Sequence, residues 1–256
     1  MKVLTVGNYK GGVAKTCTAL NLATIYASQG KRVLLIDLDP QANATDFFGL
    51  YDRAREEKRS IVEVLYQGLS IREAAHATDT PNLSIVPASL DLIDQNELLL
   101  SENVLRYALQ DVSDDYDIAI TDCNPMMKRV TLCSFIASAD GGLFLIPVKV
   151  DASIVRGISN SMRAAEMAAR AVRLNPPKVK LVRTIVPGSK TIGQQTGEQI
   201  LNGLYPNDQM QTAIHASTKV VEGTWKWKPV VEYSPKSRPA RDYLALAEEV
   251  EHVLCS

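Results

Sequence analysis

Several features are scarce in this 256-residue chain, and each scarcity excludes a class of protein. No stretch approaches the roughly 18 to 20 uninterrupted apolar residues that a membrane span needs. Met1 leads directly into an apolar run without the layout of a signal peptide. The four cysteines form no CxxC pair and have no histidine at metal-ligand spacing, which argues against a disulfide framework or a zinc site. We therefore expect a cytoplasmic protein with reduced thiols.

The net charge of −1 is close to zero but unevenly distributed. Between Lys178 and Arg241, ten basic residues stand against four acidic ones, a balance of +6, and the rest of the chain carries −7. The basic segment is compatible with salt-sensitive binding to a phosphate backbone, and also with a solvated surface that merely contains lysines. Length and composition are those of a soluble globular protein with one full core, and we expect a single domain over residues 1–256.

The most informative stretch runs from Gly7 to Thr16, between the apolar run 3–6 and a helix-forming run that starts near Cys17. A strand, a glycine-rich turn and a helix N-terminus in that order form a phosphate cradle. Glycine lets successive N–H groups point at phosphate oxygens, and the helix adds its positive dipole end. Lys15 would reach the β- and γ-phosphates of a nucleotide, and the Thr16 hydroxyl would bind Mg²⁺. The alternative is a glycine turn with two incidental lysines, but turn, lysine, hydroxyl and flanking elements all agree with the cradle.

Acidic residues follow two further apolar runs. Residues 33–36 read as a strand buried on both faces, which ends at Asp37 with Asp39 two positions later. Residues 116–121 form another apolar strand, which ends at Asp122 as in a Walker B motif. Because ligands bind at the carboxyl ends of strands in open α/β sheets, these carboxylates could serve Mg²⁺ or position a water. Taken alone, paired aspartates after a strand are also common turn formers or helix caps.

Strand and helix patterns alternate along the rest of the chain. We expect further strands at 83–86, 142–148 and 179–186, and helices at 16–29, 61–66, 71–77, 102–112 and 154–172. The charge-dense residues 51–60 are expected to form an exposed loop. This alternation predicts an α/β fold with a doubly wound, mostly parallel sheet flanked by helices.

The glycine-rich stretch resembles the deviant Walker A motif of the ParA/MinD superfamily, whose mark is a second lysine at the place held here by Lys10. In that family this lysine reaches across a dimer interface to the partner's nucleotide. The resemblance therefore implies the deviant P-loop NTPase fold, ATP binding and an ATP-dependent homodimer. It assigns Lys10, Lys15 and Asp39 to catalysis, with Asp39 orienting the attacking water, and Thr16, Asp37 and Asp122 to Mg²⁺. The implied nucleotide-binding residues are Lys10, Gly11, Gly12, Val13, Ala14, Lys15, Thr16 and Cys17.

Later segments are similar to the ParA or Soj-like partition branch, namely 146–148, the glutamine pair 194–195 and 228–237. That branch consists of ATPases that bind duplex DNA without sequence preference when ATP-loaded and so associate with the nucleoid. A ParB-type centromere-binding protein stimulates their slow hydrolysis and releases them from DNA. The resemblance implies these partners here, and no membrane.

The chain also departs from the family pattern. Ala14 replaces the glycine expected before the P-loop lysine, and Asn124 stands where two prolines usually begin. The family's basic DNA-contacting positions are altered, which leaves Lys190 and Lys219 as the candidate DNA-binding residues. The segment 225–228 interleaves tryptophan and lysine, which suits a nucleic-acid surface or, alternatively, a packed tryptophan pair.

Three rival functions stay open. A MinD-like ATPase would bind membrane through a basic amphipathic C-terminal helix, but residues 243–251 are acidic on their polar side. A reductase related to the nitrogenase iron protein would need a cluster at the dimer interface, and the glycine-rich motifs around Cys123 and Cys133 are missing. A nucleotide-gated scaffold or regulator would bind ATP and barely hydrolyse it.

Overall fold

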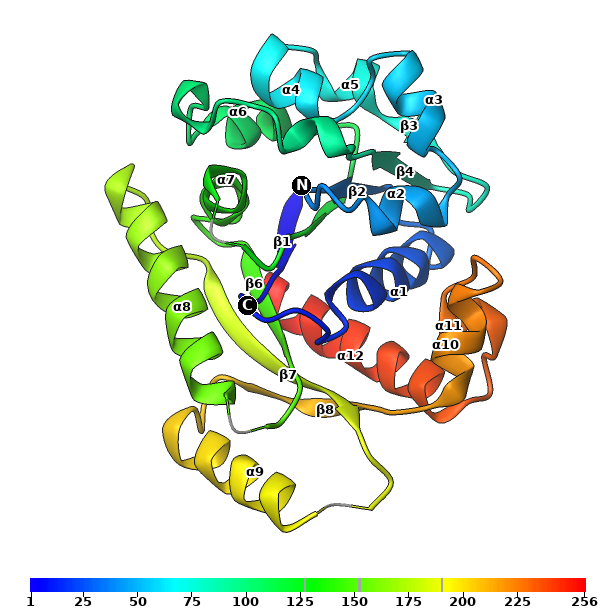
Figure 1. Cartoon of the computed structure of the whole chain (residues 1–256), viewed down its shortest axis with the longest axis vertical. Helices are drawn as coiled ribbons and strands as arrows, with labels where there is room; N and C mark the ends of the chain where they lie inside the picture. The colour runs from blue at the N-terminus through cyan, green and yellow to red at the C-terminus, as the bar shows by residue number, and fades with distance from the viewer. Residues whose placement is uncertain (127, 152, 190) are drawn as a thin grey trace.

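The computed structural model describes residues 1–126, 128–151, 153–189 and 191–256. These residues form an eight-stranded sheet in the order β3-β4-β2-β5-β1-β6-β7-β8, in which only β3 and β4 pair antiparallel (Figure 1). The strands are β1 Lys2–Val6, β2 Val33–Asp37, β3 His76–Ala77, β4 Leu83–Val86, β5 Ile118–Asp122, β6 Leu143–Val148, β7 Lys178–Val186 and β8 Gln209–His215. The expected doubly wound, mostly parallel sheet is confirmed.

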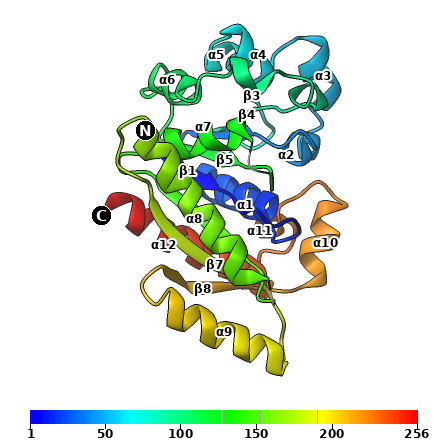
Figure 2. The same ribbon diagram turned by 60° about the vertical axis from the view of Figure 1, so that its left-hand side comes forward.

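Helices lie on both faces of the sheet. In sequence order they are α1 Lys15–Ser28, α2 Asn43–Phe47, α3 Tyr51–Glu56, α4 Ile61–Gln67, α5 Ile71–Ala74, α6 Val104–Gln110, α7 Arg129–Ala137, α8 Ile154–Ala171, α9 Ile192–Leu204, α10 Thr218–Thr224, α11 Val230–Tyr233 and α12 Arg238–Cys255, with short 3₁₀ turns at Leu90–Leu92 and Glu97–Leu99. Helices α1 and α12 cover one face, and α7 and α8 cover the other (Figures 1 and 2).

The two helical layers explain the continuous apolar runs in the central strands. Along β2, Val33 and Leu35 pack into the core beneath α1, whereas Leu34 and Ile36 pack beneath α4 and α7. A strand covered on both faces needs apolar side chains at every position. Every residue of β2 and β5 is accordingly buried, including the acid that ends each strand.

Two local expectations were wrong. Residues 51–60 were expected to form an exposed loop, but Tyr51–Glu56 is the helix α3, because Ala54 is fully buried and Arg53 pairs with Glu57 one turn later. The helix expected at 71–77 ends at Ala74, and His76–Ala77 pairs with β4 as a short edge strand. Helix α1 is buried on nearly all sides, because α12, α11 and α2 pack against it besides the sheet.

Candidate nucleotide-binding site

The loop between β1 and α1 has the geometry of an open phosphate cradle. A side chain at Gly7 would lie only 3.1 Å from the Phe144 ring and 3.3 Å from Cys123, so the loop starts tight against the sheet. A side chain at Gly11 or Gly12 would meet no atom within 4 Å, and Gly12 has φ 70°. The backbone N–H groups at the tip can therefore be approached closely by a ligand.

Side chains from distant strands hold this loop in place. The Asn8 amide donates to the Pro147 carbonyl at the end of β6 (2.8 Å), and its own oxygen accepts from the Lys10 N–H (3.0 Å). The Thr184 hydroxyl on β7 donates to the Val13 carbonyl (3.0 Å). Ala14, which stands in place of the expected glycine, adopts the left-handed conformation with φ 65°. Alanine there keeps the cradle turn but carries the backbone strain that glycine avoids.

Lys15 lies at the base of the cradle and is 8% exposed. Its ammonium group donates to the Lys10 carbonyl (3.1 Å). Burial lowers the pKa of Lys15, and the nearby charges of Asp122 and Asp39 act in the opposite direction. A buried ammonium at the base of a glycine-rich loop is suited to bind an anion such as a nucleotide phosphate.

Asp37 and Asp122 sit side by side at the ends of β2 and β5, directly paired in the sheet register, next to the end of β1. Burial, followed by the charge of Asp37, raises the pKa of Asp122 well above its ordinary value, while the Thr16 hydroxyl and Lys15 act to lower it. Both Asp122 oxygens are buried without a hydrogen-bond partner that meets normal geometry within the described residues. Such orphaned oxygens beside a threonine hydroxyl and a phosphate cradle fit the surroundings of a hydrated Mg²⁺ ion.

The described residues contain no group of three or more acidic, histidine or cysteine side chains placed to hold a metal by themselves. Besides the Thr16 hydroxyl, a magnesium ion here would need oxygen ligands from the nucleotide phosphates and from water. This is the usual arrangement for Mg²⁺, which keeps several waters and is held by one or two protein oxygens.

The two aspartates at the end of β2 differ in environment. The fully buried Asp37 accepts hydrogen bonds from the Thr45 N–H (2.9 Å) and hydroxyl (2.8 Å) and from the Asp39 N–H (3.1 Å). Burial raises the pKa of Asp37, and these bonds partly offset the rise. It therefore anchors α2 to the sheet, a role that sequence reasoning missed. Asp39 accepts from the Gln41 N–H (3.0 Å) and is 8% exposed, close enough to Lys15 to raise its pKa.

Lys10 is held away from the base of its own cradle. Its ammonium group donates to the Asp151 carboxylate and to the Ser153 hydroxyl (2.9 Å), just before α8. The Lys10 and Asp151 side chains are 30% and 37% exposed. Sequence reasoning did not identify Asp151, because it lies 141 residues away and no local pattern marks it.

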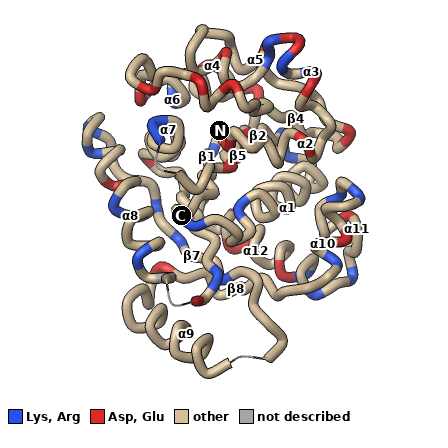
Figure 3. Tube along the Cα trace, viewed as in Figure 1, with Lys and Arg blue, Asp and Glu red and all other residues tan. Residues whose placement is uncertain are grey.

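The candidate DNA-binding residues receive uneven support. Lys190 lies outside the described residues. Lys219 is half-exposed, but its ammonium group pairs with Glu222 at 2.7 Å, so its charge is largely balanced. Trp225 and Trp227 are 81% and 59% exposed, which argues against the packed tryptophan pair. Lysines and arginines recur around α10 and α11 and along α8 (Figure 3).

Two of the cysteines near the site have buried thiols. Cys123 and Cys133 are buried beneath the sheet, and burial raises the pKa of each thiol to about 12. The Cys123 sulfur contacts the Ser134 hydroxyl at 3.1 Å. Neither thiol is presented at the surface, as a cluster shared between two subunits would require.

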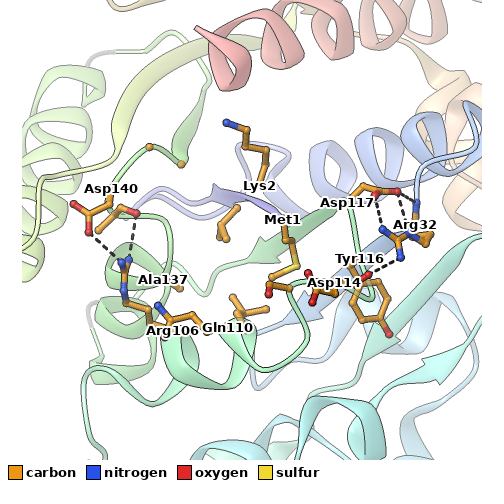
Figure 4. Close-up of a pocket in the computed structure, with 16 residues that line it drawn as sticks. Met1, Lys2, Arg32, Arg106, Gln110, Asp114, Tyr116, Asp117, Ala137 and Asp140 are labelled. Atoms are coloured by element: carbon orange, nitrogen blue, oxygen red, sulfur yellow. Dashed lines mark hydrogen bonds and ion pairs between the residues drawn. The ribbon is translucent and has the colours of Figure 1, made fainter.

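A cavity of about 690 Å³ lies at the opposite end of the strands from the cradle, where β1 and β5 begin (Figure 4). Its two arginines are each held in place, Arg32 by Asp117 and Arg106 by Asp140. This cavity is remote from the cradle and from every residue predicted to bind nucleotide. Within the described residues, no helix is both long and apolar enough to cross a membrane.

Comparisons with known proteins agree with this geometry. Residues 1–176 match the family model described as AAA domain. The chain is 30% identical to the sporulation initiation inhibitor protein Soj of Bacillus subtilis, over 97% of this chain and 98% of that protein. It is 31% identical to the chromosome-partitioning ATPase Soj of Thermus thermophilus, over 96% and 94%. It also resembles the structure of cobyrinic acid a,c-diamide synthase from Mycobacterium smegmatis with bound ADP and magnesium, with a TM-score of 0.81, 26% identity and coverage of 100% and 96%.

Proposed function

Because this chain belongs to the ParA and Soj branch of the ParA/MinD superfamily of P-loop ATPases, we propose that it is a partition ATPase driven by an ATP-dependent homodimer. In the dimer, each Lys10 contacts the partner's nucleotide. The dimer binds duplex DNA without sequence preference and so associates with the nucleoid. A ParB-type centromere-binding protein stimulates hydrolysis and returns the protein to free monomers.

The observation that carries this proposal is the contrast between the two lysines of one loop. Lys15 is buried at the base of the cradle, whereas Lys10 is partly exposed and bonded outward to Asp151 and Ser153. A lysine that serves only its own nucleotide has no reason to point outward. An outward lysine at the rim of a phosphate cradle suits a charge delivered to a second subunit.

The residues of the site divide the work of phosphoryl transfer. Backbone N–H groups of residues 11–16 would hold the phosphates, and Thr16 with Asp122 would hold Mg²⁺, which neutralises phosphate charge when bound. Lys15 and the partner's Lys10 would stabilise the charge that develops on the transferred group, while Asp39 would align the attacking water. Turnover would be slow until a partner protein completes this arrangement.

The packing of the C-terminal helix α12 favours DNA rather than a membrane as the partner that this protein binds. The apolar face of α12 packs against α1 and β8, with Tyr243, Leu246 and Val250 at most 1% exposed. A helix whose apolar face is already buried has no such face to offer a bilayer.

Co-sedimentation with non-specific duplex DNA tests the proposal, using ATP, ADP or no nucleotide, with anionic vesicles as a parallel sample. Lys10→Ala is the key variant. Lys31→Ala is a matched control. The Lys31 side chain is also 30% exposed and forms an ion pair with Glu251, but it lies at the opposite end of the strands from the cradle. Phosphate release is measured in the same samples with and without DNA.

We expect DNA binding that requires ATP and Lys10, weakens with salt, and is retained by Lys31→Ala. Binding to vesicles but not to DNA would favour the MinD-like function. ATP binding with no phosphate release under any condition would favour a nucleotide-gated regulator. Equal DNA binding by wild type and Lys10→Ala would remove the cross-dimer role of Lys10.

A further inference from the structure

The turn between α10 and α11 carries an exposed aromatic and basic surface to which the proposed function assigns no role. It consists of Trp225, Lys226, Trp227 and Lys228. Trp225 is 81% exposed and Trp227 59%. Both lysines are also exposed, and their ammonium groups have no hydrogen-bond or ion-pair partner in the described part of the chain. Leaving two indole rings in water is unfavourable, so this turn calls for an explanation.

The turn is rigid. The Gly223 carbonyl accepts hydrogen bonds from the N–H groups of both Lys226 (2.9 Å) and Lys228 (3.0 Å). A side chain at Gly223 would lie 2.7 Å from the Lys228 carbonyl, so only glycine fits beneath the turn. Trp227 is held in the left-handed conformation with φ 52°, which is strained for a large side chain. The backbone that carries the aromatic and basic side chains is therefore already ordered before binding, which lowers the entropy cost of binding.

The surroundings of the turn are mainly positive. Along residues 217–241 the lysines and arginines are Lys219, Lys226, Lys228, Lys236, Arg238 and Arg241, and the acidic residues are Glu222 and Glu232. Glu222 is already engaged by Lys219 and by the Tyr233 hydroxyl. An anionic ligand is therefore favoured.

We propose that this turn binds single-stranded nucleic acid, with unpaired bases stacking on Trp225 and Trp227 and phosphates pairing with Lys226 and Lys228. Interleaved aromatic and basic side chains match such a strand, because every unpaired base has a flat face and every linkage a negative charge. A duplex offers the charge but hides the base faces. The contact is separate from the duplex binding proposed above and does not depend on it.

The turn also touches the nucleotide end of the molecule. The Trp227 ring meets the Phe47 ring edge-on, with centroids 6.3 Å apart. Phe47 belongs to α2, whose Thr45 holds the Asp37 carboxylate. A strand bound at the turn would therefore lie against the helix that follows the Asp37 and Asp39 motif.

The test exploits the fact that Trp225 and Trp227 are the only two tryptophans in the chain. Tryptophan emission is followed while the wild-type protein is titrated with a thymidine oligonucleotide, with a blunt duplex of the same length, and with anionic vesicles. Affinity for a labelled oligonucleotide is then measured by anisotropy for Trp225→Ala and Trp227→Gly. Glycine suits the left-handed position, so the second variant removes the ring without adding strain. Leu98→Ala is the control, because Leu98 is also 81% exposed.

We expect the oligonucleotide to quench the emission and to bind more tightly than the duplex at this site. Each tryptophan variant should weaken oligonucleotide binding about fivefold or more, as for other base–aromatic stacks, while Leu98→Ala binds normally. Unchanged emission, or unchanged affinity in both tryptophan variants, would overturn the proposal. A blue shift with vesicles and no quenching by the oligonucleotide would identify the turn as a lipid contact instead. Duplex binding that needs ATP and Lys10 is scored separately and can succeed or fail without affecting this result.

Discussion

Breaking the Lys10–Asp151 ion pair should strengthen ATP-dependent dimerisation. In the subunit described here, Lys10 is bonded to Asp151 and Ser153 of its own chain. If Lys10 must contact the partner's nucleotide in the dimer, two such ion pairs break for each dimer that forms. Asp151→Asn keeps the shape of the side chain and an oxygen acceptor but removes the negative charge. Releasing Lys10 therefore costs less free energy in this variant.

The exposure of the pair sets the size of the effect. The two side chains are 30% and 37% exposed, so solvent screens the pair and its contribution is that of a surface ion pair, about 0.2 to 1 kcal/mol. Two pairs per dimer give about 0.4 to 2 kcal/mol, which lowers the dimer dissociation constant by roughly 2- to 30-fold. The hydrogen bond from Lys10 lowers the pKa of Asp151, so the carboxylate is charged at neutral pH and the effect is present there.

Sedimentation velocity with Mg²⁺ and a non-hydrolysable ATP analogue measures this constant directly. Glu251→Gln, which breaks the comparable Lys31–Glu251 pair away from the cradle, is the control and should leave dimerisation unchanged. A weaker or unaltered dimer in Asp151→Asn would refute the reasoning, since it would mean that Asp151 also stabilises the dimer or that Lys10 is not released.

Three further predictions concern the same site. Asp39→Ala should retain ATP and accumulate as a dimer because no group aligns the attacking water; normal phosphate release would remove Asp39 from that role. Ala14→Gly should raise the melting temperature by about 2 to 4 °C, since relief of a left-handed alanine outweighs the added flexibility by about 1 kcal/mol, whereas Ala19→Gly inside α1 should lower it. Asp122→Asn should stabilise the nucleotide-free protein in calorimetry, more at pH 8 than at pH 5. The raised pKa of Asp122 means that the folded state binds the proton more tightly than the unfolded state, so its stability falls as pH rises through this range; an equal gain at both pH values would contradict this.

The parts of the fold that could be predicted from the sequence are those specified by local patterns. The continuous apolar runs that end at Asp37 and Asp122 predicted buried parallel strands, and both residues do end neighbouring strands. The glycine-rich turn predicted the position of Lys15 at the start of α1. In each case the signal lies within about ten residues, where strand, turn and helix patterns are distinct.

The parts that were missed depend on contacts between distant segments. The Lys10–Asp151 ion pair joins the loops that follow β1 and β6, two strands that are neighbours in the sheet although they are far apart in the sequence. The anchoring of Asp37 by Thr45 depends on where α2 begins, which the sequence does not mark with a capping side chain. The strand β8 was not predicted, although Met210 and Ile214 are buried between more exposed residues, because the segment contains few apolar residues.

The packing of α12 against α1 has a consequence for how the protein is made. The Tyr26 hydroxyl of α1 donates to the Ala247 carbonyl of α12 (2.9 Å), and Tyr243 is buried beside Thr18. A ribosome adds about 5 to 20 residues per second, so roughly 10 to 50 seconds pass between synthesis of the first helix and of the segment that covers it. During that interval the nascent chain exposes the side of α1 that α12 later covers, including Tyr26. The phosphate cradle, which leads into α1, can therefore reach its final structure only late in translation. Until then, chaperones can bind the exposed apolar surface of the growing chain.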